Sequence, residues 1–142
     1  MSERQGLVLD ANILLRAALE RRVRHILRKF EDQATFYTAD ICFRDARKYI
    51  LTISEKQRLD AGPGLAVLAE MSQLVEPVQH ELYAKYEAQA RARIEVRDPD
   101  DWPIIAVALL LELPIWTEDQ DFFGTGIPNW TTDRVELYLQ QH

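Results

Sequence analysis

Short apolar runs alternate with longer segments of helical periodicity along this chain, a pattern that predicts an α/β fold with a parallel sheet. Strands are predicted at residues 7–9, 35–38, 74–78 and 113–117, and a short fifth strand could include Trp130. Pro77 has no N–H to donate to a neighbouring strand, so the third strand is expected at an edge of the sheet.

Apolar residues recur at helical spacing in the segments between these strands. Helices are predicted over residues 12–20, 21–30, 40–53, 79–93 and 101–111, with a last helix after residue 133. Ser54 and Glu55 are expected to open a further helical stretch, which Gly62-Pro63-Gly64 should bend or break. Pro103 places the start of the helix over 101–111 near Asp100 or Asp101, because a proline costs little in the first turn.

The composition is that of a globular protein, and its length of 142 residues fits a single domain over 1–142. No apolar run is long enough to span a membrane, and the first residues lack the basic and apolar regions of a signal peptide. The single cysteine, Cys42, excludes an internal disulfide and indicates a reducing, cytoplasmic compartment. Its apolar neighbours favour a buried structural thiol over a nucleophile.

The chain has a net charge of −6 and a pI of about 5.1. This acidity argues against a protein that holds nucleic acid by bulk positive charge. It does not exclude a nuclease, because carboxylates gathered around a metal ion make a protein acidic and the ion reverses the local charge when it binds.

Several aspartates fall where a ligand site is expected. Asp10 directly follows the first predicted strand, and Asp119 and Asp121 follow the fourth. In open α/β sheets, ligands bind outside the carboxyl ends of the strands. Asp101 begins the most apolar helix, where the helix dipole should favour its ionised form. Carboxylates suit Mg²⁺, and no two histidines have the spacing of zinc ligands.

Each of these acids also has a structural interpretation. Capping of the following helix is the favoured role for Asp98 and Asp100, and a turn role is the alternative for the acids over 119–121. Asp45 could form a surface ion pair with Lys48, which contributes little to stability. Asp10 is harder to explain in this way, because a carboxylate that follows three apolar strand residues is partly buried and needs a partner.

Three segments resemble the motifs of PIN-domain proteins. Residues 7–14 (LVLDANIL) resemble the opening strand of the family, in which an Asp is followed two residues later by a small polar residue. Residues 101–108 (DWPIIAVA) are similar to the third acidic motif, which leads into an Ala-rich helix. Residues 116–122 (WTEDQDF) are similar to the fourth motif, with a Thr, two alternating Asp residues and a Phe. Asp45 falls where the family usually has Glu.

The resemblance implies a three-layer α/β/α sandwich with a central parallel sheet of four to five strands. It also implies that the start of the Asp101 helix shares the rim with Asp10, in one acidic pocket that binds Mg²⁺ or Mn²⁺ and hydrolyses RNA. Similarity to VapC-type toxins further implies a small antitoxin partner and a homodimer.

The resulting hypothesis is a Mg²⁺-dependent endoribonuclease, the candidate toxin of a type II toxin–antitoxin pair. The expected catalytic residues are Asp10, Asp45, Asp101, Asp119 and Asp121. Asp10, Asp101 and Asp119 are expected to hold the metal, with Asp121 as the alternative to Asp119 and Asp45 assisting. Thr117 or Asn12 would orient a carboxylate or a water. Phosphate contacts are expected from Arg16, Arg44, Arg47, Lys48 and Arg97, although a solvated surface charge is the commoner role.

Two other functions fit parts of the pattern. A catalytically inactive PIN-like module that binds RNA or protein is the main alternative, and Asp45 in place of Glu motivates it. A phosphoacceptor receiver domain would need an Asp that ends the third strand and a Lys that ends the fifth, and the sequence supplies neither. The basic segment 21–30 could line a partner groove, but an ordinary amphipathic helix is the favoured interpretation.

Overall fold

A parallel sheet forms the centre of the structure, a computed structural model that describes residues 4–94 and 98–141. Within this part of the chain, five strands lie in the order β3-β2-β1-β4-β5, and all neighbours are parallel. The strands are β1 (Gln5–Leu9), β2 (Ala34–Ala39), β3 (Val75–Val78), β4 (Ile115–Trp116) and β5 (Asn129–Trp130). The predicted sheet is confirmed, including its fifth strand and the edge position of the strand that contains Pro77.

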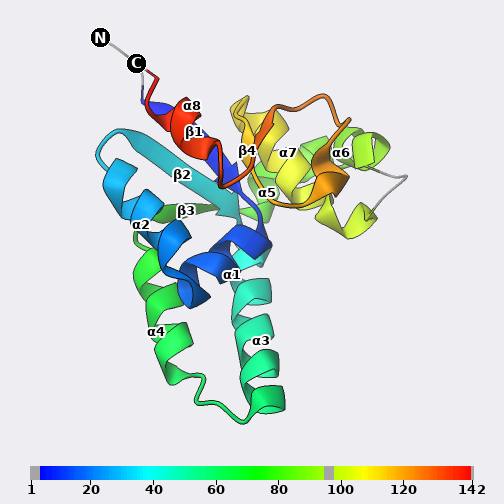
Figure 1. Cartoon of the computed structure of the whole chain (residues 1–142). Coiled ribbons are helices and arrows are strands. Elements are labelled where there is room, and N and C mark those ends of the chain that lie inside the picture. Colours follow the sequence, from blue (N-terminus) through cyan, green and yellow to red (C-terminus); the bar gives the residue numbers. More distant parts are fainter. Residues whose placement is uncertain (1–3, 95–97, 142) are drawn as a thin grey trace.

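Helices cover both faces of this sheet, which confirms the three-layer sandwich (Figure 1). One layer contains α1 (Ala11–Leu19), α2 (Arg21–Phe30), α3 (Asp40–Gln57) and α4 (Gly62–Met71). The other contains α5 (His80–Tyr83), α6 (Glu87–Ile94) and α7 (Trp102–Leu111), and α8 (Val135–Leu139) follows β5. The chain moves outward from β1 to β3 and then returns to β4 on the other side of β1. With right-handed crossovers, this reversal puts the two sets of helices on opposite faces.

The reversal also locates the ligand-binding edge of the sheet. Because strand order reverses between β1 and β4, the crevice outside their carboxyl ends is where ligands bind in such folds. Leu7, Val8 and Leu9 of β1 are fully buried, as expected for a central strand covered on both faces. Residues 102–108 of α7 are buried as well, which accounts for the apolar character of this helix all round its surface.

The boundary between α3 and α4 corrects one prediction. Ser54 and Glu55 do not open a new helix, because α3 runs without a break through Gln57. Arg58 ends it in the left-handed conformation, and its N–H reaches the carbonyl oxygens of Glu55 and Ser54. The sequence Gly62-Pro63-Gly64 does not interrupt a helix but begins α4, since a proline is tolerated in the first turn.

Other helices follow the sequence more closely. The stretch predicted over 79–93 is helical through Ile94, with the 3₁₀ turn η1 (Ala84–Tyr86) between α5 and α6. A 3₁₀ turn, η2 (Pro99–Asp101), leads into α7 at the position that Pro103 indicated. Cys42 is buried, and burial raises the pKa of its thiol to about 12, in agreement with a structural role. No helix among the described residues is long and apolar enough to cross a membrane.

The basic helix α2 is an amphipathic helix tied to its neighbours. Its apolar side, Val23, Ile26, Leu27 and Phe30, is buried as the spacing predicted. On its polar side Arg22 pairs with Asp133, Arg28 with Glu70, and Lys29 with Glu136. These pairs are exposed and each contributes little to stability. They nevertheless give three of the positive charges of α2 an acidic partner within the chain itself.

Leu9 tests how far the central strand supports the fold. Leu9→Ala should lower the free energy of unfolding by about 2–5 kcal/mol, because it leaves a cavity between two helical layers. Leu59→Ala is the control, since Leu59 is 61% exposed and its truncation should change stability by less than about 0.5 kcal/mol. Urea denaturation would measure both variants, and equal losses would contradict the assigned core.

Candidate functional site

Asp10 is buried at the carboxyl end of β1, where the backbone turns into α1. It is 6% exposed. Its Oδ1 accepts a hydrogen bond from the Ile13 N–H at 2.9 Å and thereby caps α1. Its Oδ2 accepts a hydrogen bond from the Thr117 hydroxyl. The partner that a buried carboxylate requires is thus present, and it comes from the end of the neighbouring strand β4.

The Thr117 hydroxyl links the ends of β1 and β4 because it acts both as a hydrogen-bond donor and as an acceptor. While the hydroxyl donates to Asp10, its oxygen accepts from the Asp119 N–H at 2.9 Å. Asp119 in turn accepts from the Asp121 N–H at 2.8 Å and caps the 3₁₀ turn η3 (Gln120–Phe122). The turn role considered for these acids is therefore real, and it also fixes the direction of their side chains.

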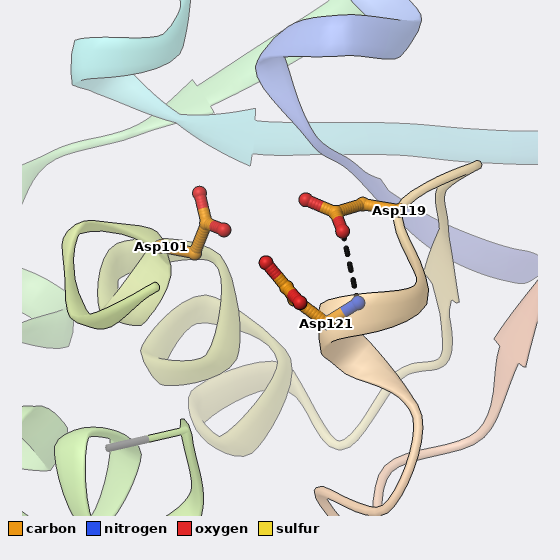
Figure 2. Close-up of side chains that lie close together, drawn as sticks. All are labelled: Asp101, Asp119 and Asp121. Atoms are coloured by element: carbon orange, nitrogen blue, oxygen red, sulfur yellow. Dashed lines mark hydrogen bonds between the residues drawn. The ribbon is translucent and has the colours of Figure 1, made fainter. Parts of the chain in front are cut away.

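Asp101 approaches the same place from the opposite helical layer. It lies at the end of η2, directly before α7, and Asp98 caps this turn by accepting from the Asp100 N–H at 3.1 Å. Figure 2 shows Asp101, Asp119 and Asp121 pointing toward one another. One carboxylate oxygen from each lies within 4.8 Å of the others. We call these three residues the acid group.

The surroundings of Asp101 raise the pKa of its carboxyl to about 7. Burial of the carboxyl is the largest cause, followed by the negative charges of Asp98, Asp119, Asp10 and Asp121. The net shift is therefore toward the neutral form of Asp101, opposite to the effect expected from the helix dipole alone. The dipole contributes a modest attraction, which burial and several like charges outweigh.

The pKa of Asp10 is raised as well, to about 6. Burial is again the largest cause, and the charge of Asp119 adds to it. The hydrogen bonds from Thr117 and Ile13 oppose this shift, because they stabilise the ionised form. The Asp10 carboxyl therefore loses its proton only near neutral pH, and a bound cation would stabilise the ionised form.

The donor set fits a hard divalent cation. All the converging atoms are carboxylate oxygens, which Mg²⁺ and Mn²⁺ prefer, and no histidine or cysteine belongs to the group. Oδ2 of Asp101 is buried without a hydrogen-bond partner. A buried carboxylate oxygen without a partner is costly, and a bound cation would satisfy it.

The predicted site residues separate into two sets. Asp101, Asp119 and Asp121 come together, and Asp10 interacts electrostatically with Asp101 and Asp119 but is not part of the acid group. Asp45 is exposed on α3 and lies outside the acid group. No ion pair joins it to Lys48, a residue that the structure also describes.

The expected phosphate-binding cations are also dispersed. Arg44 and Arg47 line a groove between α3 and α4 together with Phe43 and Leu65. Arg16 pairs with Glu20 at 3.7 Å and donates to Asn12. Arg97 lies outside the described residues.

One further acid, Asp40, lies at a strand end and was not predicted as a site residue from the sequence. Asp40 follows β2 as Asp10 follows β1, and this shared position was the signal that could have found it. Its carboxylate accepts from the His80 N–H at 3.1 Å and from the Tyr83 hydroxyl at 2.8 Å. Asp40 therefore fastens α5 to the start of α3, and Tyr83 in turn packs edge-on against Trp102 at the start of α7.

Thr117→Val would test the link between the two strands. Loss of the hydroxyl should raise the pKa of Asp10 above 6, because the hydrogen bond that favours its ionised form disappears. It should also lower the free energy of unfolding by about 1–3 kcal/mol. Carboxyl NMR titration and urea denaturation would measure the two effects. Thr117→Ser, which keeps the hydroxyl, should behave as the wild type; an unchanged Asp10 pKa in the valine variant would refute the link.

Asp101→Asn should stabilise the metal-free protein relative to the wild type, by an amount that grows as pH rises. The folded chain holds the Asp101 proton up to about pH 7, whereas the unfolded chain releases it near pH 3.8, so this group's contribution to stability is lost across that window. The advantage of the variant should grow to on the order of 1–2 kcal/mol by pH 8, with solvent screening allowed for. Urea denaturation in EDTA from pH 5 to pH 8 would show it, and a constant difference would contradict the shift.

Comparison with known structures finds the same fold in several solved proteins. The VapBC2 complex of Rickettsia felis, bound to a DNA fragment from its promoter, contains a chain that aligns with a TM-score of 0.70 at 13% identity, covering 89% of this chain and 98% of that chain. A toxin–antitoxin complex from Klebsiella pneumoniae gives 0.61 at 18% identity, with 89% and 97% covered. FitAcB from Neisseria gonorrhoeae gives 0.59 at 21% identity, with the same coverage.

Comparison of sequences locates the family. None of the curated proteins compared with this sequence matches it. The sequence model of the PIN domain matches residues 8–140, which include the carboxyl end of every strand described and every member of the acid group. This chain therefore belongs to the PIN domain family.

Proposed function

We propose that this chain is a Mg²⁺-dependent endoribonuclease that hydrolyses RNA phosphodiester bonds and serves as the toxin of a type II toxin–antitoxin pair. The observation that carries the proposal is the convergence of Asp101, Asp119 and Asp121 beside buried Asp10, in a member of the PIN domain family. The toxin assignment draws support from the similar fold of a chain in a toxin–antitoxin complex. The choice of RNA rests on the resemblance to VapC-type toxins.

Asp10, Asp101 and Asp119 are the proposed metal residues, and Asp121 is close enough to replace or join Asp119. When bound, Mg²⁺ or Mn²⁺ would supply Lewis-acid activation of water and offset the charge on the departing oxygen. Thr117 holds the Asp10 carboxylate in one orientation and fixes the backbone at Asp119. Hydrolysis adds water across a P–O bond, so one product keeps the phosphate and the other gains a hydroxyl.

The proposal includes a protein partner. A small antitoxin would bind the chain, which would form a homodimer and act in the cytoplasm. The fold that this chain shares with a chain of a toxin–antitoxin complex from Klebsiella pneumoniae supports a protein partner. A chain with a single cysteine, which is buried, needs no oxidising compartment to fold.

An inactive PIN-like module that binds RNA or protein is the alternative. The observation that favours it is the exposed position of Asp45, outside the acid group, where the family usually supplies a longer Glu. An assisting role of Asp45 in catalysis is the least supported part of the proposed site.

Cleavage of a mixed RNA pool tests the function directly. The purified protein should cut RNA with Mg²⁺ or Mn²⁺ and stop when EDTA removes the metal. Asp101→Asn should lower the rate by about 100-fold or more, because loss of even an indirect metal contact costs roughly 10–100-fold.

Asp32→Asn is the matched control for this experiment. It makes the same chemical change at an exposed residue in the turn before β2, at the opposite end of the strands, and should leave the rate unchanged. Folded wild-type protein that cuts no RNA with either metal would favour the inactive module. Equal losses in the two variants would remove Asp101 from the centre of the site.

A further inference from the structure

A second feature lies between α1 and α3, two helices that contact each other. It is a pocket of about 230 Å³. Its lining residues are Ala11, Asn12, Leu15, Asp45, Ala46 and Tyr49. The volume is below the roughly 300–1,000 Å³ of sites for drug-sized ligands, and it suits a single flat ring system.

The pocket opens next to the candidate metal site. Ala11 and Asn12 directly follow Asp10, and α1 and α3 both begin at the carboxyl edge of the sheet. Leu15 and Tyr49 lie four residues beyond Ala11 and Asp45, a rise of about 6 Å along each helix. A polymer whose backbone is cut at the acid group can therefore place a neighbouring unit in the pocket.

The surface of the pocket combines an exposed aromatic ring with small apolar side chains. Tyr49 is 52% exposed, and no hydrogen bond or ring contact within the described chain engages it. Ala11, Leu15 and Ala46 supply aliphatic walls. Nucleobases stack on such rings in proteins that bind single strands.

The polar residues of the pocket offer both a donor and an acceptor. Oδ1 of Asn12 accepts from Arg16 at 3.0 Å, which leaves the NH₂ group of Asn12 as a donor. The exposed Asp45 carboxylate is an acceptor without a hydrogen bond or ion pair among the described residues. The Watson–Crick edge of guanine presents N–H donors beside a carbonyl acceptor and matches this pair. A base can offer that edge only when it is unpaired.

We propose that the pocket between α1 and α3 binds one nucleobase of a single-stranded RNA substrate, next to the phosphate that is cleaved, and that guanine fits it best. Tyr49 stacks on the base, and Asn12 and Asp45 contact its edge. The inference rests on the proposed ribonuclease function and assigns its substrate recognition. It also gives Asp45 a role in specificity that accounts for its position away from the acid group.

The first experiment measures which bonds are cut in a random-sequence RNA and how fast. Wild-type cut sites should share a guanine at one fixed position. Tyr49→Ala should raise KM by about 10- to 100-fold, the scale expected for loss of one stacking contact, with kcat and Mn²⁺ affinity unchanged. Tyr49→Trp should keep the wild-type KM. Leu51→Ala is the control, since Leu51 is 43% exposed on the same helix and does not line the pocket.

Asp45→Asn tests the edge contact separately. It should weaken the guanine preference at the fixed position while Mn²⁺ affinity stays at the wild-type value. A fall in Mn²⁺ affinity with the base preference intact would overturn the role in specificity and return Asp45 to the metal site. Unchanged KM and unchanged cut sites in Tyr49→Ala would overturn the nucleobase pocket.

Binding experiments separate this inference from the proposed function. Fluorescent single-stranded RNA should bind to Asp101→Asn protein, which cuts slowly or not at all, and adding Tyr49→Ala should weaken binding by about 10-fold or more. If the wild type cuts nothing but binding depends on Tyr49, the ribonuclease fails and the base pocket stands. If Tyr49→Ala leaves RNA binding unchanged, the pocket proposal fails whatever the cleavage result. This is the outcome expected if the groove binds a protein partner instead of RNA.

Discussion

The buried carboxylate of Asp10 is the constraint on which the candidate site depends. A carboxylate removed from water must be hydrogen-bonded or neutralised, and Asp10 meets this need with the Ile13 N–H and the Thr117 hydroxyl. The second contact requires β4 to lie beside β1 with its end at the same height, which the register of the two strands provides. The order of the strands and the geometry of the acidic site are therefore fixed together, because the same pairing of β1 with β4 determines both.

Convergence of the acids has an energetic consequence. Asp101, Asp119 and Asp121 approach closely beside Asp10, and the raised pKa values of Asp10 and Asp101 express mainly the cost of burying these carboxyls, to which the neighbouring negative charges add. Stability is thus given up where a ligand site is formed, as is common at functional sites. A divalent cation would reverse the sign of this interaction, which is why the metal-free chain and the proposed metal-bound enzyme should differ in their dependence on pH.

The carboxyl edge of the sheet also positions what surrounds the acids. Because α1 and α3 both start there, the groove between them leads away from Asp10 and carries Asp45 and Tyr49 on its walls. Arg44 and Arg47 project from another side of α3 into the groove with α4. Residues close in sequence on one helix therefore face different surfaces.

The sequence by itself determined the strands, their parallel arrangement and the acids at the ends of β1 and β4, because apolar periodicity and proline positions are local signals. It also located the start of α7 through Pro103. The tertiary structure decided what depends on distance between remote segments: that Asp101 reaches Asp119 and Asp121 while Asp45 does not, and that burial and neighbouring charges outweigh the helix dipole at Asp101. The break between α3 and α4 was misplaced because Gly-Pro can end one helix or begin another, and only the conformation of Arg58 selects the second.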